Sequence, residues 1–230
     1  MSGLRQCFNR RLTPVESVLV VLLVGFIGAV GYFLYNFTVA RILEARVNAA
    51  LPKVCDAIRR QRGSILNAIE AYKAQFGEYP PDHVVRRNPL SVDPVTNTLL
   101  YELSGTLYRP AGKEFQVAGL EPAEAAYVTN FFQCERFKNC SEKQEQLKNF
   151  LTKQDTASRQ LHDDPDVFVL GFNVGAADVS DDLFWQIDEK VGSWRYVRSS
   201  PTNNPGKFDL WIEIKTKHRA TIIGNWKAAE

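Results

Sequence analysis

The chain is organised around one apolar stretch, S-V-L-V-V-L-L-V-G-F-I-G-A-V-G-Y-F-L-Y-N-F-T-V-A, from Ser17 to Ala40. It contains no charged residue. A helix that crosses a bilayer needs about 20 mostly apolar residues at about 1.5 Å of rise per residue. A buried core helix of this length would show a polar face, and a cleaved secretory signal has an apolar core of only about 7–15 residues. We therefore predict one transmembrane helix over residues 12–40.

The charges on either side of the span predict its orientation. Three arginines and no acidic residue precede it, whereas an acidic residue lies between the two arginines that follow it. The residues concerned are Arg5, Arg10 and Arg11 before the span, and Arg41, Glu44 and Arg46 after it. Because basic residues accumulate on the cytoplasmic side, residues 1–11 are expected in the cytoplasm and everything after Ala40 outside.

The helix is predicted to continue beyond the membrane, over residues 41–76. Apolar residues recur there mostly at intervals of three or four, which is the pattern of an amphipathic helix. They are Leu43, Val47, Leu51, Val54, Ile58, Ile65, Ile69, Tyr72 and Phe76. Gly77 is placed as a C-cap, and Pro80 and Pro81 prevent continuation.

Residues 77–230 are predicted to form a head of the α+β class. Strands are expected at 167–170, 183–187, 193–198, 208–214 and 220–223. Helical segments are expected within 121–153, one before and one after Cys140. The run Phe208 to Ile214 alternates apolar and polar side chains, which predicts a sheet with one buried face. A small antiparallel sheet on the outer half of the helix accounts for this pattern.

The composition excludes several functional classes. The net charge is +2, from 28 basic and 26 acidic residues, which argues against a nucleic-acid-binding protein. No nucleophile elbow, phosphate loop, dinucleotide fingerprint or zinc-protease pair is present, and the three histidines lie far apart. We therefore expect no enzyme activity and no cofactor. Acidic clusters at 163–166 and 178–182 fit either calcium ligands or turn caps, and no metal site is assigned to them.

Two of the four cysteines, Cys134 and Cys140, are close in sequence in the region expected outside the cytoplasm. Disulfides form in such compartments, so a small disulfide loop between them is predicted. A zinc site is less favoured, because no neighbouring cysteine or histidine supplies two further ligands.

Glu16 lies at the edge of the span. An unpaired carboxylate within a membrane helix costs about 2.5–3.5 kcal/mol on insertion scales, so such a residue is a functional candidate. A position in the headgroup region, where the carboxylate costs little, is the alternative. Pro14 is tolerable only in the first helical turn, because its missing N–H needs no partner there.

Three matches occur in the same order as in a known family. They are L-T-P-V-E at Leu12–Glu16, A-I-E-A-Y-K-A-Q-F-G-E-Y-P at Ala68–Pro80, and a C-terminal group made of W-R-Y at Trp194–Tyr196, P-G-K-F-D-L-W at Pro205–Trp211 and I-G-N-W at Ile223–Trp226. Together they resemble type IV pilin-like proteins, and most of all the major pseudopilin of type II secretion. The resemblance covers the helix and the C-terminal third of the chain, and leaves an insertion at about 113–165 outside the family pattern.

The resemblance implies a pseudopilin-like subunit in the bacterial inner membrane, with its head in the periplasm. It would assemble laterally, through residues that include Glu16, Thr13 and Leu12, with copies of itself or related pseudopilins on a secretion-system assembly platform. The head residues that match the family are Tyr79, Pro80, Asp209, Trp211, Asn225 and Trp226. The alternative is a stand-alone membrane-anchored protein whose pilin-like head binds a partner outside the cytoplasm.

Two features depart from the family. Arg11 and Leu12 stand where the family has the glycine that the prepilin peptidase requires and the phenylalanine that follows it, so the leader junction is degenerate. The segment Ile214–Arg219 stands where major pseudopilins have an acidic calcium loop. It offers no carboxylate, and calcium prefers carboxylate and carbonyl oxygens, so no calcium site is expected there.

Overall fold

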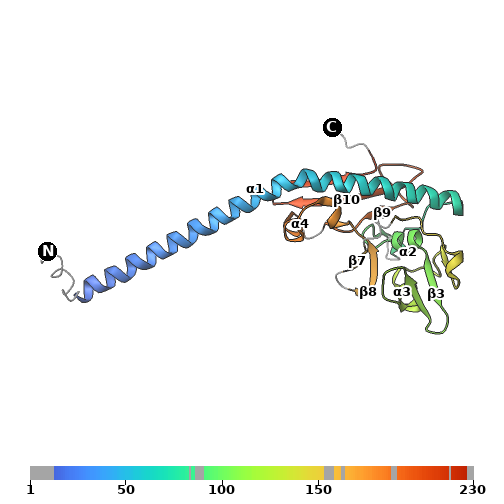
Figure 1. Ribbon diagram of the computed structural model, residues 1–230, viewed down its shortest axis with the longest axis horizontal. Helices are drawn as coiled ribbons and strands as arrows, with labels where there is room; N and C mark the ends of the chain where they lie inside the picture. The colour runs from blue at the N-terminus through green and yellow to red at the C-terminus, as the bar shows by residue number, and fades with distance from the viewer. Residues whose placement is uncertain are drawn as a thin grey trace. The chain divides into compact units, whose positions relative to one another are not determined.

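The structure is a computed structural model that describes residues 13–82, 84–85, 91–152, 158–161, 164–187, 191–217 and 219–226. It divides into two compact units, Met1–Asn48 and Ala49–Glu230. One helix, α1 (Pro14–Phe76), contributes residues to both units, and short helices and small sheets make up the rest (Figure 1). The α+β class is therefore confirmed.

The part of α1 in the first unit is apolar and exposed. Every large apolar side chain from Val15 to Leu43 is between 38% and 73% exposed. By length and composition this helix can cross a membrane. The predicted long apolar helix is confirmed, and it begins at Pro14, where a proline is tolerated.

The part of α1 in the second unit buries one face. Its buried residues follow the predicted intervals of three and four, and they are Ala50, Val54, Cys55, Ala57, Ile58, Gln61, Ile65, Ala68, Ile69 and Tyr72. The helix ends at Phe76 as predicted. Gly77 has a φ of +81°, and its N–H donates to the carbonyl of Lys73 over 2.8 Å. This left-handed cap favours glycine because a side chain there is strained.

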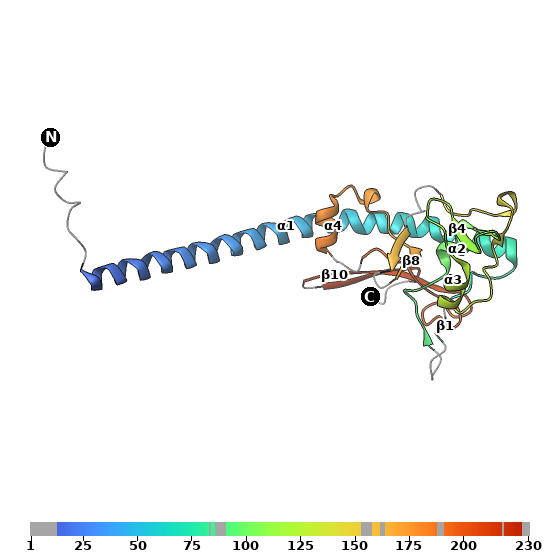
Figure 2. The same ribbon diagram turned by 90° about the horizontal axis from the view of Figure 1, so that it is seen from below.

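A three-stranded antiparallel sheet packs along this part of α1 (Figure 2). Its order is β11 (Arg219–Gly224), β10 (Asp209–Thr216), β9 (Arg195–Val197). Leu210, Ile212 and Ile214 are buried on one face of β10, while the residues between them are less buried, as the alternation predicted. The amide of Gln61 on α1 accepts from the indole N–H of Trp194 over 3.2 Å, which ties helix and sheet together.

The head also contains a four-stranded sheet. Its order is β5 (Ala123–Glu124), β4 (Glu114–Val117), β3 (Thr106–Arg109), β6 (Cys140–Ser141). Only the β3–β6 pairing is parallel among the pairs in this sheet. The helix α2 (Leu99–Ser104) precedes the sheet in sequence, and the helix α3 (Ala125–Phe131) lies between β5 and β6. Every residue of α2 is buried.

The remaining described elements are short. They are the hairpin β1 (Val84–Val85) with β2 (Ser91–Val92), the hairpin β7 (Ser158–Leu161) with β8 (Asp164–Leu170), the 3-10 turns η1 (Gln144–Gln146) and η2 (Val174–Ala177), and the helix α4 (Asp181–Ile187).

Two local predictions were wrong. The expected strand at 183–187 is the helix α4, which begins with two acidic residues that suit a helix N-terminus and buries Phe184 and Ile187 three residues apart. The expected helix after Cys140 is a single 3-10 turn followed by extended chain. There the N–H of Phe150 donates to the carbonyl of Leu103 over 2.8 Å, so contacts with α2 replace helical ones.

Candidate functional site

The N-terminal end of α1 is closed by a reciprocal pair of hydrogen bonds. The N–H of Thr13 donates to Oε2 of Glu16 over 2.8 Å, and the N–H of Glu16 donates to Oγ1 of Thr13 over 3.3 Å. This is a capping box, in which the side chains at the cap and three residues later each satisfy the other's free backbone N–H. The structure thus brings together two of the three predicted assembly residues.

The third predicted assembly residue, Leu12, and the degenerate leader junction at Arg11 lie outside the described residues. The sequence T-P-V-E at Thr13 to Glu16 carries the capping pattern, but sequence reasoning considered only a membrane role for the glutamate. The carboxylate of Glu16 therefore has a local structural partner in addition to any role that it plays between subunits.

Asp209, at the start of β10, organises the loop before it. Its buried carboxylate accepts hydrogen bonds of 2.8–2.9 Å from the backbone N–H groups of Thr202, Asn203 and Asn204. The side-chain amides of Asn203 and Asn204 donate to it as well, over 3.1 and 2.9 Å. N–H donors thus surround both oxygens, which stabilises a buried carboxylate and offers no oxygen ligands to a cation.

Asn225, just after β11, joins that loop to both long strands. Its Oδ1 accepts from the N–H of Leu210 and from Nδ2 of Asn204, each over 3.0 Å. Its own Nδ2 donates to the carbonyl of Phe208 over 3.0 Å. The family-like residues Asp209 and Asn225 are therefore parts of one hydrogen-bonded cluster, which we call the C-terminal clasp (residues 202–204, 208–210 and 225).

The other family-like head residues pack around this clasp. The rings of Trp211 and Trp226 meet edge to face, with centroids 5.8 Å apart. A Cβ atom on Gly224 would lie 2.6–2.7 Å from the Trp226 ring, so only glycine fits the I-G-N-W motif in this arrangement. The rings of Tyr79 and Phe208 also meet edge to face, with their centroids 4.9 Å apart.

Pro80 also contacts this region through its backbone, since its carbonyl accepts from the hydroxyl of Tyr196 over 2.8 Å. The Y-P pair after α1 is thus held against the same part of the sheet as the clasp. Sequence reasoning found these residues through the family motif alone, and the structure supplies their physical role, which is to fasten the end of the chain to the end of α1.

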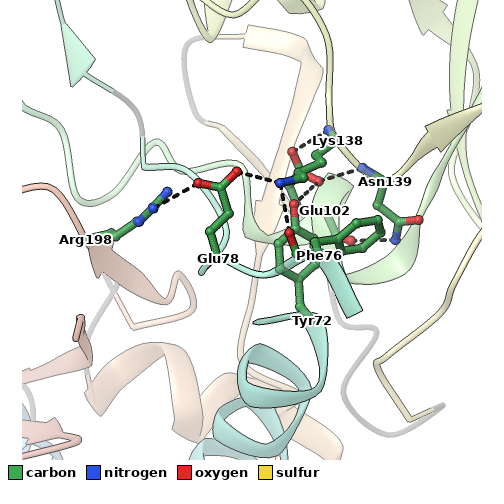
Figure 3. Close-up of polar contacts among 7 residues, drawn as sticks. All are labelled: Tyr72, Phe76, Glu78, Glu102, Lys138, Asn139 and Arg198. Carbon is green, nitrogen blue, oxygen red and sulfur yellow. Dashed lines mark hydrogen bonds and ion pairs between the residues drawn. The ribbon is translucent and has the colours of Figure 1, made fainter. Parts of the chain in front are cut away.

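A buried carboxylate that sequence reasoning missed lies at the C-terminal end of α1. Glu102 on α2 is 0% exposed. It accepts from the hydroxyl of Tyr72 over 2.9 Å, from the N–H of Lys138 over 2.9 Å and from the N–H of Asn139 over 3.0 Å (Figure 3). Burial raises the pKa of Glu102, and these donors partly oppose that shift. In the sequence, the only indication that Glu102 is buried is its position as a single acid inside the apolar run L-L-Y-E-L.

The side chain of Lys138 forms an ion pair with a different carboxylate, that of Glu78. It donates to Oε1 of Glu78 over 2.6 Å and to the carbonyl of Phe76, the last residue of α1, over 3.1 Å (Figure 3). A cation at a helix C-terminus is favourable because free carbonyls accumulate there. Arg198 reaches the other oxygen of Glu78 over 3.0 Å, and hydrogen bonds from these two cations lower the pKa of Glu78. Three distant segments thus meet at the end of α1.

The cysteine prediction needs correction. Cys134 and Cys140 are free thiols in the structure, so the predicted disulfide between them is absent from it. The two residues lie in different local structures: Cys140 begins β6, whereas Cys134 follows α3 and its N–H donates to the carbonyl of Thr129 over 3.0 Å. Burial raises the pKa of both thiols.

The described residues contain no group of three or more His, Cys, Asp or Glu side chains placed to hold a metal ion. The histidines and Asp163 lie outside the described residues. No protein-family model, curated protein or solved structure matches this chain.

Proposed function

We propose that this chain is a pseudopilin-like subunit of a type II secretion or type IV pilus-like system, anchored in a bacterial inner membrane with its head in the periplasm. One observation carries the proposal. A single helix, α1, exposes every large apolar side chain in its first part and buries an apolar stripe under the head in its second. Such an element needs lipid or neighbouring apolar helices around its first part.

The order of the sequence motifs supports the same proposal. The helix ends at the predicted Phe76–Gly77 boundary, and the family-like residues Asp209 and Asn225 form one cluster. In a fibre the contacts between identical helices are heterologous, and heterologous contacts that do not close build open helical assemblies. In this proposal Glu16 meets a positive group of a neighbouring subunit as the helices pack.

The alternative is a stand-alone anchored protein that binds a partner with its head. The block 113–165, which falls outside the family motifs, favours it, because this block supplies three strands of the four-stranded sheet and carries the exposed Tyr127. The two functions differ in what they require of α1. A fibre subunit needs specific contacts between neighbouring helices, whereas an anchor needs only lipid.

Crosslinking in the membrane separates the two functions. A cysteine is introduced at Val24, on the exposed part of α1, in a background in which the four native cysteines are replaced. Copies of a fibre subunit are expected to form disulfide-linked dimers through this position. Glu16→Gln keeps the capping box, because glutamine can fill that position, but it removes the charge.

In a fibre subunit, Glu16→Gln is expected to reduce the crosslinked fraction severalfold. Glu44→Gln, which removes a carboxylate from α1 on the other side of the apolar stretch, is the matched control and should preserve crosslinking. Equal crosslinking in the Glu16→Gln variant and the parent, with normal insertion of both, would favour the stand-alone anchor.

A further inference from the structure

A half-open cavity of about 300 Å³ lies in the block outside the family motifs, between α3 and the segment 135–142. Its apolar wall is formed by Tyr108 on β3, Phe115 on β4 and Ala125 on α3. Neither the membrane span nor the C-terminal clasp uses it. The family resemblance does not account for this block either.

The polar wall of the cavity carries an excess of negative charge. Glu135 and Glu142 line it, together with a single arginine, Arg136. The guanidinium of Arg136 is held by the carbonyl of Cys140, to which its Nη2 donates over 2.8 Å. Both glutamates are exposed, and neither has an ion pair or hydrogen bond with another described residue.

Two other glutamates on the head surface have cationic partners. Glu78 is paired with Lys138 and Arg198, and Glu213 with Arg195 and Lys215. Unpaired carboxylates beside an apolar wall therefore distinguish this cavity from those surfaces. Charge complementarity points to a guest that has a positive end and an apolar stem.

We propose that this cavity binds a lysine or arginine side chain presented by a partner protein. The aliphatic stem would lie against Phe115 and Tyr108, whose rings also attract a cation at their faces, and the charged end would lie between Glu135 and Glu142. Because the cavity is half open, it can enclose one side chain while the body that carries that side chain stays outside. This inference does not depend on whether the protein forms a fibre.

A matched pair of peptides tests the proposal. The probes are acetyl-Gly-Lys-Gly-amide and the same peptide with norleucine, which keeps the stem and removes the charge. Binding is followed in the full chain in detergent by NMR of the Ala125 and Ala126 methyl groups, which lie at the cavity. The lysine peptide is expected to shift these signals saturably, and at least tenfold more tightly than the norleucine peptide.

The double substitution Glu135→Gln/Glu142→Gln is expected to weaken binding of the lysine peptide at least tenfold. The control Glu121→Gln/Glu124→Gln removes the same charge from two exposed acids of the same block that do not line the cavity, and should leave binding within twofold. Ala126→Trp places a bulky side chain at an exposed lining position, and should abolish the shift of the remaining Ala125 signal without changing the thermal unfolding temperature.

Three results would overturn the proposal: equal binding of the two peptides, shifts that do not saturate, or equal effects of the two double substitutions. If the lysine peptide fails while a free small amine such as cadaverine binds saturably, the cavity takes a small cationic ligand, and the partner-protein assignment is wrong.

Discussion

The hydroxyl of Tyr72 on α1 donates to Oε2 of Glu102 on α2 over 2.9 Å, and both side chains are 0% exposed. This bond joins the long helix to the helix that precedes the four-stranded sheet. The same carboxylate accepts from the backbone of Lys138 and Asn139, so it fixes the position of a third segment. A buried carboxylate without these donors would be strongly unfavourable, and we expect the head to depend on them.

Tyr72→Phe is expected to lower the free energy of unfolding by about 1.5–3 kcal/mol, the usual range for a hydrogen bond to a charged group. Urea denaturation of the full chain in detergent, followed by tryptophan fluorescence, measures the change. Tyr108→Phe removes the same atom from a tyrosine whose hydroxyl has no hydrogen bond with another described residue, and should cost less than about 0.5 kcal/mol. Equal effects would show that the Tyr72–Glu102 bond contributes nothing specific.

The burial of Glu102 should make the free energy of unfolding depend on pH. Because burial raises its pKa above the ordinary 4.5, the native state binds the proton more tightly than the unfolded state. The free energy of unfolding therefore falls as the pH rises from about 4.5 through the native pKa of Glu102. Glu78 has a lowered pKa, so its contribution is present above 4.5 and is lost as the pH falls below it.

Glu102→Gln isolates this effect. The amide cannot accept all three hydrogen bonds, so the variant should be less stable than the parent at every pH. Its decline in stability above pH 4.5 should nevertheless be shallower, because the titrating group is gone. Denaturation curves at several pH values measure the slope, and a slope equal to that of the parent would contradict the assignment to Glu102.

The sequence predicted the features of this fold that depend on regular spacing. The apolar stripe that ends at Tyr72 and the alternation along β10 each repeat over several residues, so single exceptions do not hide them. The chemistry of proline placed Pro14 in the first turn of the helix and its start at residue 12 or 13, and the described helix begins at Pro14. The helix α4 was missed because its seven residues are too few to separate the two periods by apolar pattern alone.

The polar clusters could not be predicted in the same way. The donors to Asp209 are mostly backbone N–H groups, whose positions depend on the path of the 202–204 loop and carry no residue-specific signal. Glu102 meets Lys138 and Asn139 across more than thirty residues of chain, so no local pattern connects them. The capping box of Thr13 and Glu16 was readable from the sequence.

Asp209→Ala is expected to destabilise the head by about 3 kcal/mol or more, because several N–H donors lose their acceptor at once. Asn203→Ala removes only one side-chain donor from the same clasp and should cost about 1 kcal/mol. Hydrogen exchange supplies a local measurement: the amides of Thr202, Asn203 and Asn204 should exchange faster in Asp209→Ala. If they keep their protection, the clasp does not depend on the carboxylate.

The rate of alkylation tests whether Cys134 is a free thiol with a raised pKa. Burial raises the pKa of this thiol to about 11, against an ordinary value of 9.0. Only the thiolate is nucleophilic, so at pH 8 its alkylation should be on the order of 100-fold slower in the folded chain than in urea. The rate should rise about tenfold for each pH unit up to pH 10.

The measurement uses a chain in which Cys134 is the only cysteine, with Cys7, Cys55 and Cys140 replaced, and follows iodoacetamide incorporation by mass spectrometry. Cys134 should react quantitatively once the chain is unfolded. The unmodified parent, unfolded without reductant, should incorporate one label at Cys134 and one at Cys140, because the structure holds both as free thiols. Failure of both to react until a reductant is added would show that they are joined, and would contradict the structure at this point.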